Sequence, residues 1–213
     1  MIGRYFLEAI TKRQIISTVL RKDFGTENSN LRDFQQALRY NHYDDQAGEN
    51  SFIFVKSTAN QRIERFWSHF RRHTLDFFIA LFKNMEDLNL LNVKNPIHIE
   101  VLRYCFGPII EHYIKLSKKE WNDHRIRKQN FRNIAGGIPN VLYYCPEFHN
   151  GVQCGKAVNL DHVKILLKEY TSEPYLVDPE VKTILDDLFG HEAPHTSEQA
   201  LYLYFKIIDF LNM

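Results

Sequence analysis

Hydrophobic residues follow two different patterns in the first part of the chain. From Arg4 to Thr11 they recur every three or four residues, which predicts the last turns of a helix. Short runs of β-branched and aromatic residues at 15–20 and 51–56 have the length and composition of buried strands. Between these runs, residues 30–40 again show helical spacing. Strands that alternate with helices predict an α/β fold.

The next part of the chain has only helical patterns. From Ser57 onward, apolar side chains recur at three- and four-residue steps as far as Met85. Asn95 and Pro96 predict the start of a second long helix, and Gly107–Pro108 is expected to kink it.

A glycine- and proline-containing stretch at 135–139 is predicted to be a linker. It divides the chain into a region over 1–135 and a small C-terminal extension over 136–213. In the extension we expect a short apolar stretch at 141–144, a loop that contains Cys145, His149 and Cys154, and then two or three helices.

Composition narrows the class of protein. Of the 213 residues, 44% are hydrophobic and 25% charged, which excludes wholesale disorder. The net charge is only +1, so any contact with nucleic acid must come from a local cationic patch. Three cysteines argue against a disulfide scaffold and for a reducing compartment. No apolar run reaches the ~18 residues of a membrane span, so no membrane partner is expected.

Two acidic residues follow the two predicted strands. Asp23 comes just after the first strand, and Glu64 lies one turn inside the helix that follows the second. Ligands of α/β sheets gather beyond the carboxyl ends of strands, so both acids can converge there. Carboxylates are suitable ligands for Mg²⁺ or Mn²⁺, and two such ions can catalyse phosphoryl transfer. Taken singly, Asp23 is better explained as a turn residue and Glu64 as a solvated helical acid, and it is the two motifs together that favour a site.

Around these acids the sequence resembles the integrase core of retroviral integrases and DDE-type transposases, with its RNase H-like fold. The likeness is closest to animal proteins descended from integrases of mobile elements, and it covers roughly residues 4–147. The resembling strings are Lys22–Asn28 and Ser57–Trp67, with further support from Asn95–His98, Trp121–His124 and Gly137–Pro139.

The resemblance implies that Asp23 is the second catalytic and metal-binding acid of the family and Glu64 the third. The family's first Asp lies on an opening strand well upstream, whereas the only acid before Asp23 here is Glu8. We therefore expect a partial RNase H-like integrase core that lacks its opening strands, followed by a helical region and the C-terminal helical extension. Mg²⁺ or Mn²⁺ is expected only if the site is completed, and no strand transfer or 3′-end processing is expected from this chain alone.

Cationic residues cluster around the second acid. Such clusters hold nucleic-acid backbones through phosphate contacts, although a solvated helix face explains them equally well. The predicted DNA-binding residues are Lys22, Asn60, Arg62, Arg65, Arg71 and Arg72, and His69 and His73 lie among them. A second basic cluster extends from His124 to Arg132.

The spacing of Cys145, His149 and Cys154 is unlike that of a structural zinc site, because eight residues separate the cysteines and no second pair exists. No zinc site is predicted.

Three functions remain open. The first is an integrase-derived DNA-binding protein with an incomplete strand-transfer site. The second is a non-catalytic scaffold that retains the fold, and the third is a metal-dependent nuclease of the same fold. Whether the chain is an enzyme is left open. DNA is the expected partner, with homo-oligomers also considered, and the expected location is intracellular, the nucleus being favoured over the cytoplasm.

The missing opening strands imply that Ile15, Ile16, Val19 and Leu20 lie on an unpaired hydrophobic edge. An exposed edge of this kind promotes aggregation. We therefore expect the chain to be a fragment, from an incomplete gene model or a decayed element, and to be poorly soluble without the upstream segment.

Overall fold

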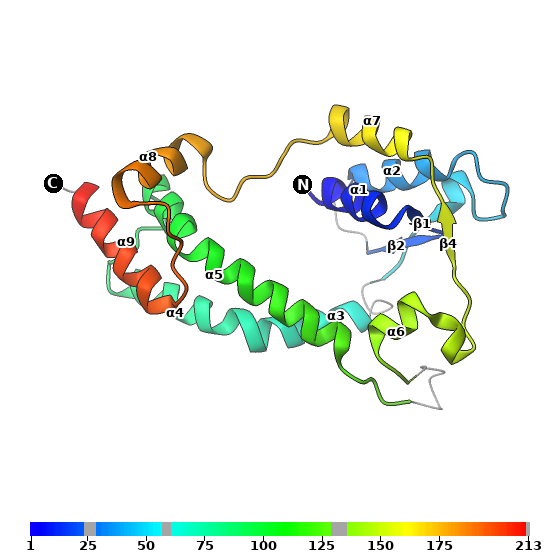
Figure 1. The fold of residues 1–213 in the computed structure, drawn as a ribbon, viewed down its shortest axis with the longest axis horizontal. Helices are drawn as coiled ribbons and strands as arrows, with labels where there is room; N and C mark the ends of the chain where they lie inside the picture. Colours follow the sequence, from blue (N-terminus) through cyan, green and yellow to red (C-terminus); the bar gives the residue numbers. More distant parts are fainter. Residues whose placement is uncertain (24–28, 57–60, 129–135, 212–213) are drawn as a thin grey trace. The chain divides into compact units, whose positions relative to one another are not determined.

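The computed structural model describes residues 1–23, 29–56, 61–128 and 136–211, apart from the side chains of residues 29 and 62 (Figure 1). These residues form two compact units. Unit 1 comprises Met1–Arg65 and Asn140–Pro174, and unit 2 comprises Phe66–Pro139 and Tyr175–Met213. Both units therefore combine an early and a late part of the chain. The domain boundary predicted between residues 135 and 136 was placed from the sequence alone. It stays a prediction.

Unit 1 is a mixed α/β unit. Its early part contains α1 (Ile2–Arg13), β1 (Ile15–Ser17), β2 (Leu20–Lys22), α2 (Ser29–Arg39), the 3₁₀ helix η2 (Gly48–Ser51) and β3 (Phe52–Phe54). Its late part contains α6 (Pro139–Tyr144), the 3₁₀ helix η6 (Pro146–His149), β4 (Gly155–Ala157) and α7 (Leu160–Tyr170). The two predicted helices and the second predicted strand of this unit are confirmed.

The single strand predicted over residues 15–20 is instead two short strands with different partners. β1 pairs antiparallel with β4, whereas β2 pairs parallel with β3. At the junction, the Thr18 hydroxyl donates a hydrogen bond to the carbonyl of Cys154, and the Thr18 carbonyl accepts one from Arg39 Nε at 3.4 Å. These hydrogen bonds lie where the chain changes from pairing with β4 to pairing with β3. The spacing of apolar residues does not predict such contacts.

The expectation of an unpaired edge is wrong for β1. Ile15, Ile16 and Ser17 stand opposite Ala157, Lys156 and Gly155 of β4, and Ile16 is 1% exposed. The C-terminal extension, expected to be helical, therefore also supplies a strand to unit 1. Its helix α7 contributes to the same core, whose buried members are Leu7, Ile10, Ile16, Phe34, Leu38 and Val163.

Unit 2 is helical. It contains the end of α3 (Gln61–Phe70), the π-helical turn η4 (Arg71–Leu75), α4 (Asp76–Asp87), α5 (Pro96–Asp123), α8 (Pro179–Phe189) and α9 (Ser197–Leu211). The long helical pattern that ends near Met85 is thus confirmed from Gln61 onward, with one wider turn in its middle, whereas its predicted start at Ser57 lies outside the described residues. α5 begins as predicted, because Asn95 Oδ1 accepts a hydrogen bond from the N–H of Ile97 at 3.0 Å.

The core of unit 2 lies chiefly between α4, α5 and α9. Its fully covered residues include Cys105, Ala200, Tyr204 and Ile207. Close packing explains the glycine in the Gly107–Pro108 pair, because a Cβ on Gly107 would meet the side chain of Leu176. No helix in the described part of the chain is long and apolar enough to cross a membrane.

Candidate nucleic-acid interface

The carboxyl ends of β2 and β3 lie side by side in unit 1. Lys22 stands opposite Phe54 in the parallel register, and the Lys22 carbonyl accepts a hydrogen bond from the N–H of Val55 at 2.7 Å. Asp23 follows β2 directly and is half-buried. The first predicted acid therefore lies where a parallel strand pair presents its ligand-binding edge.

The second acid lies on the helix that follows β3. Glu64 is in the first turn of α3, and its side chain is exposed. Residues 57–60, which include the predicted DNA-binding residue Asn60 and connect β3 to α3, lie outside the described residues. Glu64 is thus available to solvent and follows the neighbouring strand, as the sequence predicts.

The chemistry of the two acids bears on whether a two-metal centre can form. Asp23 and Glu64 offer the oxygen ligands that Mg²⁺ and Mn²⁺ prefer. Within residues 1–23, 29–56, 61–128 and 136–211, however, no three His, Cys, Asp or Glu side chains gather into a group that could hold a metal ion. The described residues alone therefore do not form a two-ion centre.

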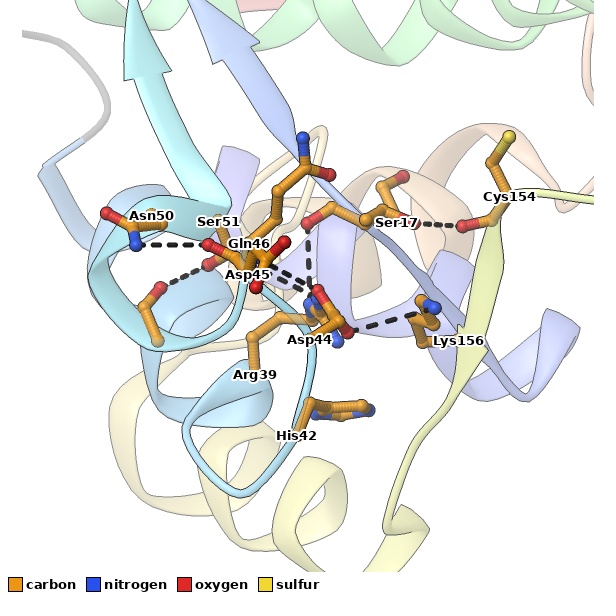
Figure 2. A network of polar contacts seen from close by, with 12 residues as sticks. Ser17, Arg39, His42, Asp44, Asp45, Gln46, Asn50, Ser51, Cys154 and Lys156 are labelled. Atoms are coloured by element: carbon orange, nitrogen blue, oxygen red, sulfur yellow. Dashed lines mark hydrogen bonds and ion pairs between the residues drawn. The ribbon is translucent and has the colours of Figure 1, made fainter.

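A buried arginine holds together the segments that precede β2 and β3 (Figure 2). The Arg39 side chain is fully buried at the end of α2, and its Nη2 donates to both carboxylate oxygens of Asp44, at 2.6 and 2.8 Å. Arg39 also donates to the carbonyls of Thr18 and Gln46. It thereby links the β1–β2 junction to the loop that leads into β3.

Further polar contacts extend this network. Gln35, one turn before Arg39 on α2, donates to the Ser17 carbonyl at 2.8 Å. Lys156 of β4 lies 3.8 Å from Asp44. The hydrogen bond from Arg39 is the main reason that the pKa of Asp44 is below its usual value. The carboxylate is therefore held ionised opposite the guanidinium.

The sequence analysis did not identify this network. Gln35 and Arg39 are separated by one helical turn and lie beside the apolar positions Phe34 and Leu38 of α2. Two polar side chains next to the apolar stripe of an amphipathic helix could have indicated a buried polar network. Their partners come from loops and strands, and the sequence pattern does not specify those.

The predicted phosphate-binding residues are divided between the two units. In unit 1, Lys22 is half-buried and Arg65 is exposed. In unit 2, Arg71 and Arg72 are exposed on η4, and Arg71 Nε lies 3.4 Å from Asp76. The side chain of Arg62 is not described. Exposed cations thus follow Glu64 in the sequence, Arg65 in unit 1 and Arg71 and Arg72 in unit 2, and each suits contact with a phosphate.

A group of histidines surrounds Trp121 in unit 2. The ring of His69 lies 4.3 Å from that of His73 and 5.3 Å from Trp121, and Trp121 lies 4.9 Å from His124 (centroid distances). Burial lowers the pKa of His69, and the neighbouring His73 and His124 lower it further. The pairing of His69 with His73, one turn apart, was visible in the sequence. The contribution of Trp121 from the end of α5 was not.

The cysteine and histidine loop belongs to unit 1. Cys145 is half-buried before η6, Cys154 is exposed before β4, and both are free thiols. The absence of zinc stays a prediction.

Unit 1 is thus a mixed α/β unit with an acid at the end of a parallel strand pair, and a helix with a second acid and cations follows. A family model described as the integrase core domain matches residues 2–143. This match spans well over half of the 213 residues, so the chain belongs to the integrase core domain family. Neither the curated proteins nor the solved structures gave a significant match.

Membership confirms the predicted relationship to integrases and a nucleic-acid-related function. The likeness to animal proteins in particular, the RNase H-like strand order and the missing opening strands stay predictions.

Proposed function

We propose that this chain is an integrase-derived nucleic-acid-binding protein whose metal-dependent strand-transfer site is incomplete. The observation that carries the proposal is the arrangement at the strand ends. Asp23 follows the paired ends of β2 and β3, and Glu64 follows β3 on α3. By the likeness to the integrase core these are two of the three acids that the family uses. Without a further carboxylate, Mg²⁺ or Mn²⁺ would bind weakly, and strand transfer or 3′-end processing is not expected from this chain alone.

DNA is the proposed partner, and cations near Glu64 are its proposed contacts. Arg65, Arg71 and Arg72 are exposed, so each can reach a phosphate without first leaving a buried position. Duplex DNA carries a dense row of negative charge, and each neutralised phosphate releases counterions. Because the proposed partner is DNA, we propose that the protein acts in the nucleus. We also propose that the chain forms homo-oligomers.

A salt titration of DNA binding tests this function. A fluorescein-labelled DNA duplex is titrated with the chain at several salt concentrations, and fluorescence anisotropy reports the affinity. We expect a steep decrease in affinity with salt. The variant R65Q/R71Q/R72Q is expected to flatten the slope of log K against log[salt] by up to about 2.7, since each phosphate that is no longer neutralised removes about 0.9.

The matched control K12Q/K94Q/K168Q removes the same charge from exposed lysines elsewhere on the chain. If the control flattens the slope as much as R65Q/R71Q/R72Q does, the α3 and η4 cations are not specific contacts. No binding at low salt would favour the alternative function, a non-catalytic scaffold that retains the integrase fold.

Catalysis is tested separately with a labelled oligonucleotide in the presence of Mg²⁺ or Mn²⁺. We expect no cleavage or joining. Turnover that Glu64→Gln abolishes would contradict the proposed incompleteness and would instead support a metal-dependent nuclease or transferase.

A further inference from the structure

The segment predicted to be a linker is built into unit 2. Ile126 and Gly137 exchange two backbone hydrogen bonds, of 2.8 and 3.0 Å, in an antiparallel bridge. A Cβ on Gly136 would lie 2.8 Å from the backbone nitrogen of Lys128, so only glycine permits this approach. Gly137 has φ = 145°, which also favours glycine. The two glycines therefore bring the chain back against the basic segment after α5.

This return forms the walls of an open cationic hollow of about 480 Å³. Its lining consists of Arg125, Ile126, Arg127, Lys128, Gly136 and Gly137. The side chains of Arg125, Arg127 and Lys128 are exposed, and no acidic residue of the described chain lines the hollow. Within the described part of the chain, none of these three cations forms an ion pair with a carboxylate. Three positive charges thus gather locally in a protein whose net charge is only +1.

Contacts of the neighbouring residues hold the backbone on one side of the hollow in place. His124, the residue that follows α5, packs its ring against Trp121 at a centroid distance of 4.9 Å, and its Nδ1 lies 2.5 Å from the Trp121 carbonyl. Ile126 is half-buried between the two arginines and makes the bridge to Gly137. The cations are therefore carried by a backbone that is fixed at its start and at its bridge.

We propose that this hollow binds a phosphate of a nucleic-acid backbone, an assignment that rests on the proposed DNA-binding function and adds a second contact to it. Guanidinium groups bind phosphate oxygens through paired hydrogen bonds, and a lysine adds a mobile positive charge. Arg125, Arg127 and Lys128 carry donors only, which matches the acceptor oxygens of a phosphate. We therefore expect the contact to be mainly to the backbone, which carries no sequence information.

The first test compares two triple variants that remove the same charge. Binding of the labelled duplex is measured by anisotropy for R125Q/R127Q/K128Q and for K12Q/K94Q/K168Q. We expect the hollow variant to flatten the salt slope by about 0.9 for each phosphate that the hollow no longer neutralises, and to bind about tenfold more weakly or worse at low salt. Equal effects of the two variants would overturn the proposal, because net charge alone would then explain binding.

The second test changes the shape of the hollow without changing its charge. Gly136→Ala places a methyl group against the backbone of Lys128. We expect this variant to bind DNA several-fold more weakly while thermal unfolding of the chain is little altered. Wild-type affinity for Gly136→Ala would overturn the role of the bridged backbone.

These outcomes separate this proposal from the proposed function. Weakened binding by R65Q/R71Q/R72Q, with unchanged binding by R125Q/R127Q/K128Q, would leave the proposed function intact and refute the hollow. Failure of the wild-type chain to bind DNA would refute both. An acidic peptide that displaces the duplex from the wild type but not from R125Q/R127Q/K128Q, while the latter retains DNA affinity, would assign the hollow to a protein partner instead.

Discussion

Lys22 and Val55 are joined by a 2.7 Å backbone hydrogen bond that holds the carboxyl ends of two parallel strands together one residue before Asp23. This bond is the local basis of the candidate site. It places the segment that ends in the first acid beside the segment that leads to the second.

Hydrogen exchange of the Val55 amide tests this pairing. We expect it to exchange much more slowly than the amide of Val152, because exchange requires the strand ends to separate, whereas Val152 is 79% exposed in a loop. Residue-resolved exchange measured by NMR provides the comparison. Equal rates at the two valines would mean that the strand ends are not held together in solution.

Replacement of the buried arginine is expected to destabilise unit 1. Arg39→Met removes the guanidinium contacts to Asp44, Thr18 and Gln46 and leaves Asp44 without its main partner. We expect a decrease of about 2 kcal/mol in the free energy of unfolding, since the hydrogen bonds of a fully buried guanidinium to two backbone carbonyls and to the partly exposed Asp44 carboxylate are lost. Urea unfolding followed by circular dichroism measures the change.

Arg32→Met is the matched control for Arg39→Met. Arg32 lies on the same helix and pairs with Asp33, but both side chains are about half exposed. An exposed pair contributes little, so a change below about 0.5 kcal/mol is expected. A similar decrease in both variants would show that the burial of Arg39 is not what matters.

The histidines around Trp121 are expected to make unit 2 sensitive to mild acid. Burial, together with His73 and His124, depresses the pKa of His69 below its ordinary 6.5. The unfolded chain therefore binds this proton more tightly than the folded chain does. Stability is fully present above pH 6.5 and decreases as the pH falls below that value.

Two measurements check the prediction for His69. An NMR titration of the imidazole protons is expected to show His69 titrating below pH 6.5. In urea unfolding between pH 7.5 and 5.5, His69→Gln is expected to reduce the decrease in stability on acidification. A His69 that titrates at or above pH 6.5 would contradict the structure.

Tyr204 is expected to resist ionisation. Its ring is fully buried, its hydroxyl donates to the Leu90 carbonyl at 3.2 Å, and His98 Nδ1 lies 2.9 Å away. Burial raises the pKa of Tyr204 to about 12. Because the folded chain retains the proton that the unfolded chain releases near pH 10, this residue destabilises the fold as the pH rises from 10 toward 12.

Ultraviolet titration of tyrosinate absorbance measures this behaviour. The wild type is expected to show one more late-ionising tyrosine than Tyr204→Phe, in which Tyr104 remains, because burial and Asp186 also raise the pKa of Tyr104. Tyr202→Phe serves as the control, because Tyr202 lies on the same helix and is 72% exposed. Disappearance of one late-ionising tyrosine in Tyr202→Phe, but not in Tyr204→Phe, would refute the assignment.

The sequence by itself determined the local elements and the position of the two acids along them. Apolar spacing predicted α2, α4 and α5, and Asn95 marked the start of α5 correctly, because helix periodicity and capping depend on residues a few positions apart. Short apolar runs likewise predicted β3. Asp23 and Glu64 were found in the same way, as acids that follow these elements.

Only the tertiary structure decided which segments pair. β1 takes its partner from residues 155–157, Arg39 takes its partners from a loop and a strand junction, and Gly137 returns to Ile126. The residues next to these contacts in the sequence do not identify the partners. Strand pairing and buried hydrogen bonds depend on which distant segments tertiary packing brings together. The structural role of Arg39, and that of Gly136 and Gly137 in the predicted linker, can be recognised only in the folded chain.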